Sequence, residues 1–204
     1  MYSFIAENTI NNKCPSLFLS KIKKNGEINH IRELSSLIGV LQPTDHHPEG
    51  DVFTHTLIVI DAAAMLKKNF SNDEEKAVFM LAALCHDFGK PYSTTAKNGK
   101  ITAPKHDIYG LAPAYNFLKK AGFEKISPQI LNLIKEHSKP VQLYRDKDTI
   151  SHKALVRLSQ RVDIISLLLL QSADSAGKNK NFPGEFSDAT KWLMEKLNIT
   201  SLLK

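Results

Sequence analysis

Residues 77–91, AVFMLAALCHDFGKP, form an apolar run that ends in His86 and Asp87. A helix that is apolar on every side is normally buried inside a bundle. Gly89 and Pro91, which follow the pair, are typical of a helix end. We therefore predict a buried helix that ends at Asp87 and carries a histidine and a carboxylate into the interior.

The chain on both sides of this run shows apolar residues at helical spacing. The predicted helices cover residues 31–40, 51–68, 107–121, 128–137, 151–159, 162–176 and 188–197. Residues 42–50 are rich in Pro and predict a loop, and residues 92–104 predict a loop or a small hairpin. Apolar and polar residues do not alternate over a convincing strand length, so the predicted fold class is all-α.

The composition is that of an ordinary globular chain. Its 204 residues include 27 Lys and Arg against 21 Asp and Glu, and 42% are hydrophobic. The net charge of +6 and the pI near 9.2 favour anionic partners such as nucleotides or nucleic acid. Two cysteines are too few for a disulfide framework or a four-thiolate zinc site. Because the sequence shows neither a signal peptide nor an apolar run of membrane-spanning length, we expect a soluble, cytoplasmic protein with no membrane partner.

Polar side chains lie on the most apolar of the predicted helices. His55 lies within VFTHTLIVI, His86 and Asp87 follow FMLAALC, and Asp174 follows IISLLLLQSA. A buried carboxylate is costly unless it is paired. A divalent cation held by two neutral imidazoles and two carboxylates would satisfy all four side chains at once. Taken singly, each histidine is also explained as a hydrogen-bonded core residue, and Asp87 as a helix-end residue.

Helix geometry restricts where such an ion can lie. Neighbouring side chains on a helix diverge by about 100°. His86 and Asp87 can therefore contact one ion only if it lies beside the helix end, with His55 and Asp174 approaching from other helices. Asp163 is predicted as a helix-start residue rather than a ligand.

The order His, His-Asp, Asp resembles the signature of the HD-domain metal-dependent phosphohydrolases. Five blocks of sequence carry a closer resemblance, to the HD domain of bacterial tRNA nucleotidyltransferases. They are HHPEGDVFTHT (46–56), LAALCHDFGKP (81–91), His-x-x-x-Gly (106–110), LIKEH (133–137) and LVRLSQRVDI with ADSAG (155–177). The resemblance covers roughly residues 30–177 and implies an all-α, HD-domain-like helical bundle. Residues 30–204 are accordingly predicted as one HD-type domain, and residues 1–29 as an N-terminal extension.

The resemblance also implies a metal site. Its ligands would be His55, His86, Asp87 and Asp174, and their nitrogen and oxygen atoms suit Mn, Fe, Co, Ni, Zn or Mg without choosing among them. Asp87 would also orient the attacking water or accept its proton. Lys90 would neutralise charge on a phosphate, or would be a solvated lysine at a helix end.

Four more residues match family positions. His106 and His137 are expected to bind phosphate, protonate the leaving oxygen or serve a structural role, and Ser138 after His137 argues against a full second metal site. Arg157 and Arg161 are expected either to contact phosphate or to form a solvated pair. His46 and His47 are expected to line the pocket.

The leading functional prediction is a phosphohydrolase that acts on nucleotides or RNA ends, such as 2′,3′-cyclic or terminal phosphates. About 30 residues precede the match, too few for a nucleotidyltransferase domain, so nucleotide addition is not expected. The alternative is a non-catalytic nucleotide- or RNA-binding HD module. A purely structural helical protein is less favoured, because unused buried Asp and His side chains would reduce stability. Protein partners are left open.

Overall fold

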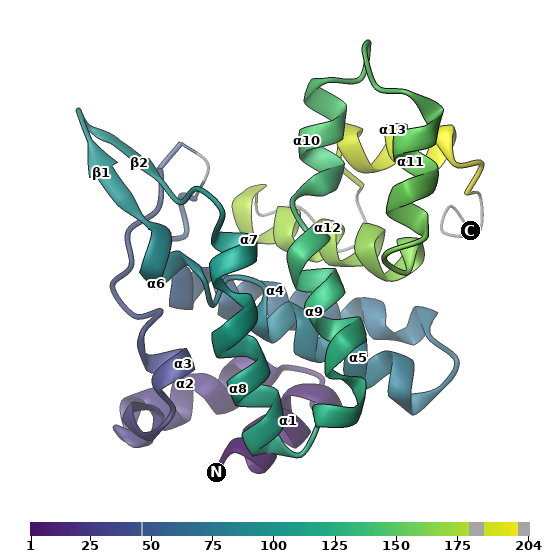
Figure 1. Ribbon diagram of the computed structural model, residues 1–204. Coiled ribbons are helices and arrows are strands. Elements are labelled where there is room, and N and C mark those ends of the chain that lie inside the picture. Colours follow the sequence, from purple (N-terminus) through teal and green to yellow (C-terminus); the bar gives the residue numbers. More distant parts are fainter. Residues whose placement is uncertain (46, 180–185, 200–204) are drawn as a thin grey trace.

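The computed structural model describes residues 1–45, 47–179 and 186–199. These residues form a helical bundle with a small two-stranded sheet at one corner (Figure 1). In chain order the elements are α1 (Tyr2–Asn11), α2 (Pro15–Lys24), η1 (Glu27–His30), α3 (Arg32–Ser35), α4 (Val52–Leu66), η2 (Lys67–Asn69), α5 (Asp73–Cys85), α6 (Lys90–Ser93), β1 (Thr95–Lys97), β2 (Lys100–Thr102), α7 (His106–Tyr109), α8 (Leu111–Ala121), η3 (Glu124–Ile126), α9 (Ser127–Glu136), α10 (Lys139–Arg145), α11 (His152–Ser159), α12 (Ile164–Asn179) and α13 (Asp188–Lys196). The predicted all-α class is confirmed. Among these described helices, none is both long and apolar enough to cross a bilayer.

Helices α4, α5 and α12 form the centre of the bundle (Figure 1). Helix α5 buries every residue from Ala77 to Cys85, and α12 buries the leucines from Leu167 to Leu170. Removing this apolar surface from water is the main favourable term in folding. Because neighbouring helices enclose this centre, the polar residues that it holds, among them His55 and Asp174, are also withdrawn from water.

Side-chain caps mark where two of the central helices begin. Oδ1 of Asp51 accepts a hydrogen bond from the backbone N–H of Thr54 at 2.8 Å, at the start of α4. Oδ2 of Asp163 accepts one from the N–H of Ser166 at 2.7 Å, at the start of α12. Each carboxylate satisfies a backbone donor that has no partner within its helix. Asp163 is therefore a helix-start residue, as predicted.

The first two helices pack on the bundle. Helix α1 contacts α5 and α8, and α2 contacts α4. Ile5, Leu19 and Ile22 are buried in the same hydrophobic cluster as the central helices. Residues 1–29, predicted as an extension, thus contribute side chains to the core of the bundle.

Two predicted helices are shorter or divided in the structure. The helix predicted over 31–40 is shortened to Arg32–Ser35, and the chain continues as a turn over residues 36–39 that closes at Gly39, whose φ of 76° is left-handed. Leu34 and Leu37 are buried nonetheless, so their spacing correctly indicated burial but not helix length. The helix predicted over 107–121 is divided into α7 and α8.

Strands β1 and β2 form the small hairpin predicted within 92–104. They pair antiparallel, with Lys97 opposite Lys100. Asn98 and Gly99 form the turn, with φ angles of 51° and 72°. Asn-Gly suits a two-residue hairpin turn because both positions need positive φ. The hairpin projects away from the bundle (Figure 1).

Candidate metal centre

Three helices deliver the four predicted metal ligands to one place. His55 lies in α4 and Asp174 in α12, while His86 and Asp87 directly follow the last residue of α5. Because α4 packs against both α5 and α12, these side chains converge. All four residues are buried. The site lies beside the end of a helix, where the diverging directions of His86 and Asp87 require it.

One donor group consists of His55, His86 and Asp174. One ligand atom from each lies within 4.8 Å of the other two. Nε2 of His55 is 2.9 Å from Oδ1 of Asp174. Nε2 of His86 is buried and has no hydrogen-bond partner among the described residues. A buried nitrogen without a partner is costly, and a cation would supply one.

Asp87 belongs to a second donor group with His106 and His137, whose ligand atoms also lie within 4.8 Å of one another. Oδ2 of Asp87 is 3.1 Å from Nε2 of His86, whereas its Oδ1 is 3.6 Å from Nε2 of His106. The Nε2 atoms of His106 and His137 are 3.1 Å apart. Within the described part of the chain, Oδ1 of Asp87 has no hydrogen-bond partner, whereas Oδ2 forms an ion pair with Nζ of Lys90. The carboxylate therefore lies between two groups of nitrogen ligands.

Three of the histidines have their tautomer set by the backbone. Each has its Nδ1 within hydrogen-bond distance of the carbonyl oxygen three residues earlier. The pairs are His86 with Ala83 (2.8 Å), His106 with Ala103 (2.8 Å) and His137 with Ile134 (2.6 Å). A carbonyl only accepts, so Nδ1 carries the proton and Nε2 presents its lone pair to the site. Neutral imidazoles in this orientation, together with carboxylates, are a donor set that fits a divalent cation.

His55 is oriented by a carboxylate instead. Oε1 of Glu49, in the loop before α4, lies 2.8 Å from Nδ1 of His55 and 2.8 Å from Nδ1 of His47. Only 4% of the Glu49 side chain is exposed. Glu49 is not among the predicted site residues, because a loop residue has no periodic spacing that relates it to a helix. His47 lines the pocket as predicted, and His46 lies outside the described residues.

Charges within the site shift the pKa values of its groups. Burial opposes ionisation of Asp87 and Asp174, but nearby imidazoles and lysines outweigh it and hold both pKa values well below 3.8. Burial also opposes ionisation of Glu49, yet the hydrogen bonds from two histidines lower its pKa to about 2. Burial lowers the pKa of His137 to about 3. At neutral pH the carboxylates are ionised and His137 is neutral, which are the forms that ligate metals.

The site opens into a cavity of about 190 Å³ with two lysines in its wall. Nζ of Lys90 is 2.7 Å from Oδ2 of Asp87 and donates to Oε1 of Gln42 at 2.6 Å. Nζ of Lys178 forms an ion pair with Oδ2 of Asp174. The sequence analysis identifies Lys90 but not Lys178, although a lysine four residues after an aspartate on a helix is a spacing that predicts a contact.

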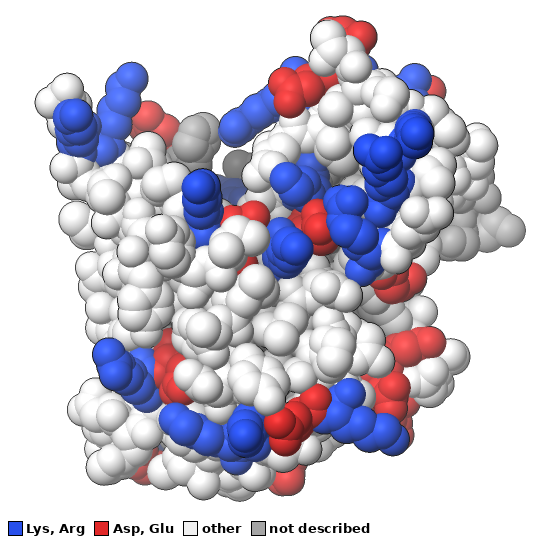
Figure 2. Space-filling view, in the orientation of Figure 1, with Lys and Arg blue, Asp and Glu red and all other residues white. Residues whose placement is uncertain are grey.

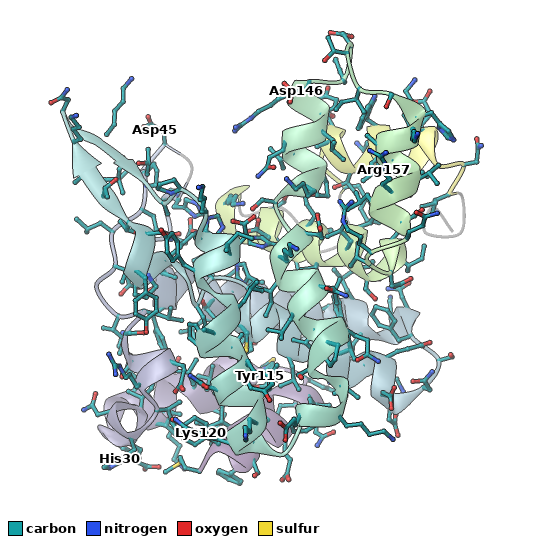
Figure 3. The ribbon with its side chains drawn as sticks, viewed as in Figure 1. His30, Asp45, Tyr115, Lys120, Asp146 and Arg157 are labelled. Carbon is teal, nitrogen blue, oxygen red and sulfur yellow. The ribbon has the colours of Figure 1, made fainter. Side chains whose placement is uncertain are left out.

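The structure does not bring Arg157 and Arg161 into this cavity. No arginine is among the described residues that line it. Arg157 lies on α11, in the lobe that α10, α11 and α13 form (Figure 3). Nε of Arg161 donates to Oε1 of Glu136 at 2.9 Å. Arg161 lines a different cavity, of about 530 Å³, together with Asp163.

Comparisons with known proteins bear on this region. A sequence model of the HD domain family matches residues 52–176, which include all four predicted metal ligands. The chain is 33% identical over 115 residues to the multifunctional CCA protein of Haemophilus influenzae (strain PittGG), covering 56% of this chain and 27% of that protein. It is 37% identical over 101 residues to the multifunctional CCA protein of Actinobacillus pleuropneumoniae serotype 5b (strain L20), covering 49% and 23%. A longer match, 26% identical over 183 residues, is to the multifunctional CCA protein of Aliivibrio salmonicida (strain LFI1238) and covers 84% of this chain and 41% of that protein. The matched region is thus less than half the length of each of these relatives.

Proposed function

This chain belongs to the HD domain family, and we propose that it is a metal-dependent phosphohydrolase acting on phosphate esters of nucleotides or RNA ends. The proposed substrates are 2′,3′-cyclic phosphates and terminal 2′- or 3′-phosphates. One observation carries the proposal. Asp87 is buried between two groups of histidine nitrogens, its Oδ1 has no hydrogen-bond partner within the described residues, and the cavity beside it has two lysines in its wall.

The proposed metal ligands are His55, His86, Asp87 and Asp174. Asp87 would also serve the second donor group with His106 and His137, so we propose that these two histidines are ligands rather than proton donors. A bound divalent cation would lower the pKa of a water molecule and polarise the phosphoryl group. Its identity among Mn, Fe, Co, Ni, Zn and Mg is left open by this donor set.

The lysines of the cavity give the phosphate a place to bind. Gln42 accepts a hydrogen bond from Lys90 and so holds its ammonium group in the cavity wall. Lys178 reaches the cavity from the last turns of α12. Ammonium groups near the equatorial oxygens of a phosphate stabilise the charge that develops there during hydrolysis. Asp87, whose low pKa keeps it ionised, would orient the attacking water by accepting a hydrogen bond from it.

The test combines metal analysis with turnover. Purified protein is expected to contain a divalent metal, and to hydrolyse 2′,3′-cyclic AMP or 3′-AMP when Mn²⁺, Co²⁺ or Ni²⁺ is added. Asp87→Ala should bind less metal and lose activity by about 100-fold or more. Asp73→Ala is the matched control, because its side chain is fully exposed at the start of α5.

The absence of turnover across these substrates and metals would contradict the proposal. If oligonucleotides then bound equally well to the wild type and to Asp87→Ala, the chain would instead be a non-catalytic RNA-binding module.

A further inference from the structure

The cavity at the metal centre adjoins a larger open groove. The groove has a volume of about 690 Å³ and runs between the β1–β2 hairpin, the loop of residues 43–45 and the end of α10. We propose that this groove binds the single-stranded nucleotides next to a terminal phosphate placed at the metal centre. That a terminal phosphate binds at the metal centre rests on the proposed function. That further nucleotides bind beside it rests on the volume and the charges of the groove.

The cavity and the groove are lined in part by the same residues. Pro43, Ile101, Thr102 and Ala103 line both the cavity and the groove. A ligand whose phosphate lies beside Asp87 can therefore extend along these residues into the groove. With a volume of about 190 Å³, the inner cavity is the smaller of the two, which suits a phosphate and its sugar rather than a chain.

The charges in the groove favour an anionic ligand. Lys100 lies on the hairpin wall and Arg145 lies on the wall formed by α10, and both side chains are exposed. Figure 2 shows Lys and Arg side chains around the hollow between the hairpin and the α10 lobe. Asp45 is the acidic residue among those that line the groove, and it lies on the side of the hairpin (Figure 3). Together with Lys90 and Lys178 in the cavity, the cations follow the path that a phosphodiester backbone would take.

The wall of the cavity also offers a hydroxyl group. Oγ1 of Thr94 is buried and, within the described residues, has no hydrogen-bond partner. Thr94 lines the cavity directly before β1 begins. A ribose hydroxyl or a phosphate oxygen of a bound strand would satisfy it.

The lining predicts how selective the groove is. None of the described residues that line it is aromatic, so bases have no stacking platform there. Binding would depend on phosphate contacts and on apolar contact with Pro43, Ile101 and Pro104. We therefore expect weak dependence on base sequence and a steep dependence on salt.

Binding is measured by fluorescence polarisation with a six-nucleotide single-stranded RNA that ends in a 3′-hydroxyl. This probe carries no terminal phosphate to be removed, so the measurement does not require turnover. The variant Lys100→Glu/Arg145→Glu should bind it at least about tenfold more weakly, and its slope of log K against log salt should fall by about 0.7 for each phosphate that the variant no longer neutralises. Asp45→Asn should bind it more tightly. Hydrolysis of 2′,3′-cyclic AMP should stay within about twofold of the wild type in both variants, because its phosphate and sugar bind in the inner cavity and it has no further nucleotides to place in the groove.

The matched control is Lys24→Glu/Lys125→Glu, which makes the same change in charge at two exposed lysines outside the groove. Equal loss of binding in this control would overturn the proposal, since net charge alone would then explain it. Wild-type affinity in Lys100→Glu/Arg145→Glu would overturn it as well, even if the enzyme hydrolysed mononucleotides. Selective loss of binding in that variant, with no turnover by any form of the protein, would support the groove and contradict the proposed function.

Discussion

Glu49 contacts two histidines of the site through a single oxygen, and it does so from a loop. Its Oε1 faces Nδ1 of both His47 and His55, while His86 is oriented by a backbone carbonyl. A carboxylate behind a metal-binding histidine fixes the orientation of the ring and raises the basicity of the nitrogen that faces the metal. Glu49 also adds a negative charge close to the proposed cation. It acts through His55 and is therefore a positioning residue.

At this scale we predict that Glu49→Ala lowers metal affinity by about 10- to 100-fold. Glu49→Gln should lower it less, because the amide oxygen still accepts a hydrogen bond from His55 while the charge is removed. Isothermal titration of metal-free protein with Mn²⁺ or Co²⁺ measures both effects without reference to activity. Glu7→Gln, exposed on α1, is the control. Unchanged affinity in Glu49→Ala would contradict the positioning role.

At the scale of elements, the packing of α7 against Gly89 and α6 decides whether the second donor group exists. A Cβ atom added to Gly89 would lie 1.9 Å from the carbonyl oxygen of His106 and 2.5 Å from the nitrogen of Gly110. The φ of Gly89 is −86°, so its backbone would accept any side chain. Space is therefore what requires glycine here. This close approach of α7 brings His106 to Asp87.

Gly89→Ala should force α7 away from the His-Asp turn and cost about 1–3 kcal/mol of stability. It should also lower the number of metal ions bound per chain, because His106 would leave Asp87. Thermal unfolding of the metal-free protein and metal analysis of the loaded protein measure the two effects. Gly110→Ala provides the comparison, since its added Cβ would meet its nearest atoms at 3.1 Å and should cost less. Equal stability and metal content in wild type and Gly89→Ala would show that α7 can shift without loss.

At the scale of the whole molecule, the bundle encloses several histidines whose pKa shifts make stability depend on pH in opposite directions. Burial and the charge of Lys90 lower the pKa of His47 to about 4, and burial lowers that of His137 to about 3. Both histidines take up protons near pH 6.5 when the chain unfolds, so the stability they contribute is complete above pH 6.5 and is lost as the pH falls towards 4. His55 acts in the opposite sense. Its pKa is raised, because Asp174 and Glu49 outweigh burial, so its contribution is present below pH 6.5 and lost at higher pH.

We therefore predict that the metal-free protein loses stability between pH 6.5 and pH 4, since the contributions of His47 and His137 are lost over this range while that of His55 stays constant below pH 6.5. The contribution of His47 over this range is on the order of 2 kcal/mol. Thermal unfolding in a chelator at pH 7, 5.5 and 4 measures the loss, and His47→Gln should make the dependence shallower. A melting temperature that rises on acidification would contradict this balance of pKa shifts.

Local patterns in the sequence specify the helices, several of their caps and the chemical identity of the ligands. Apolar spacing predicted the central helices, Asp163 lies at a helix start as expected, Asp51 caps the helix predicted to begin at residue 51, and the His-Asp pair was predicted to lie at a helix end. These features depend on residues within a few turns of one another, so periodicity and capping chemistry reveal them.

The grouping of the ligands, by contrast, depends on how the helices pack. His55 and Asp174 are 119 residues apart in the chain, yet their side chains touch. Asp87 lies between His86 on one side and His106 and His137 on the other. The sequence did not predict this second group, because Ser138 rather than a histidine follows His137. Glu49 acts across a loop. Helical spacing places a side chain on a face of its own helix, but contacts between helices depend on how those faces meet, and no local pattern in the sequence specifies that.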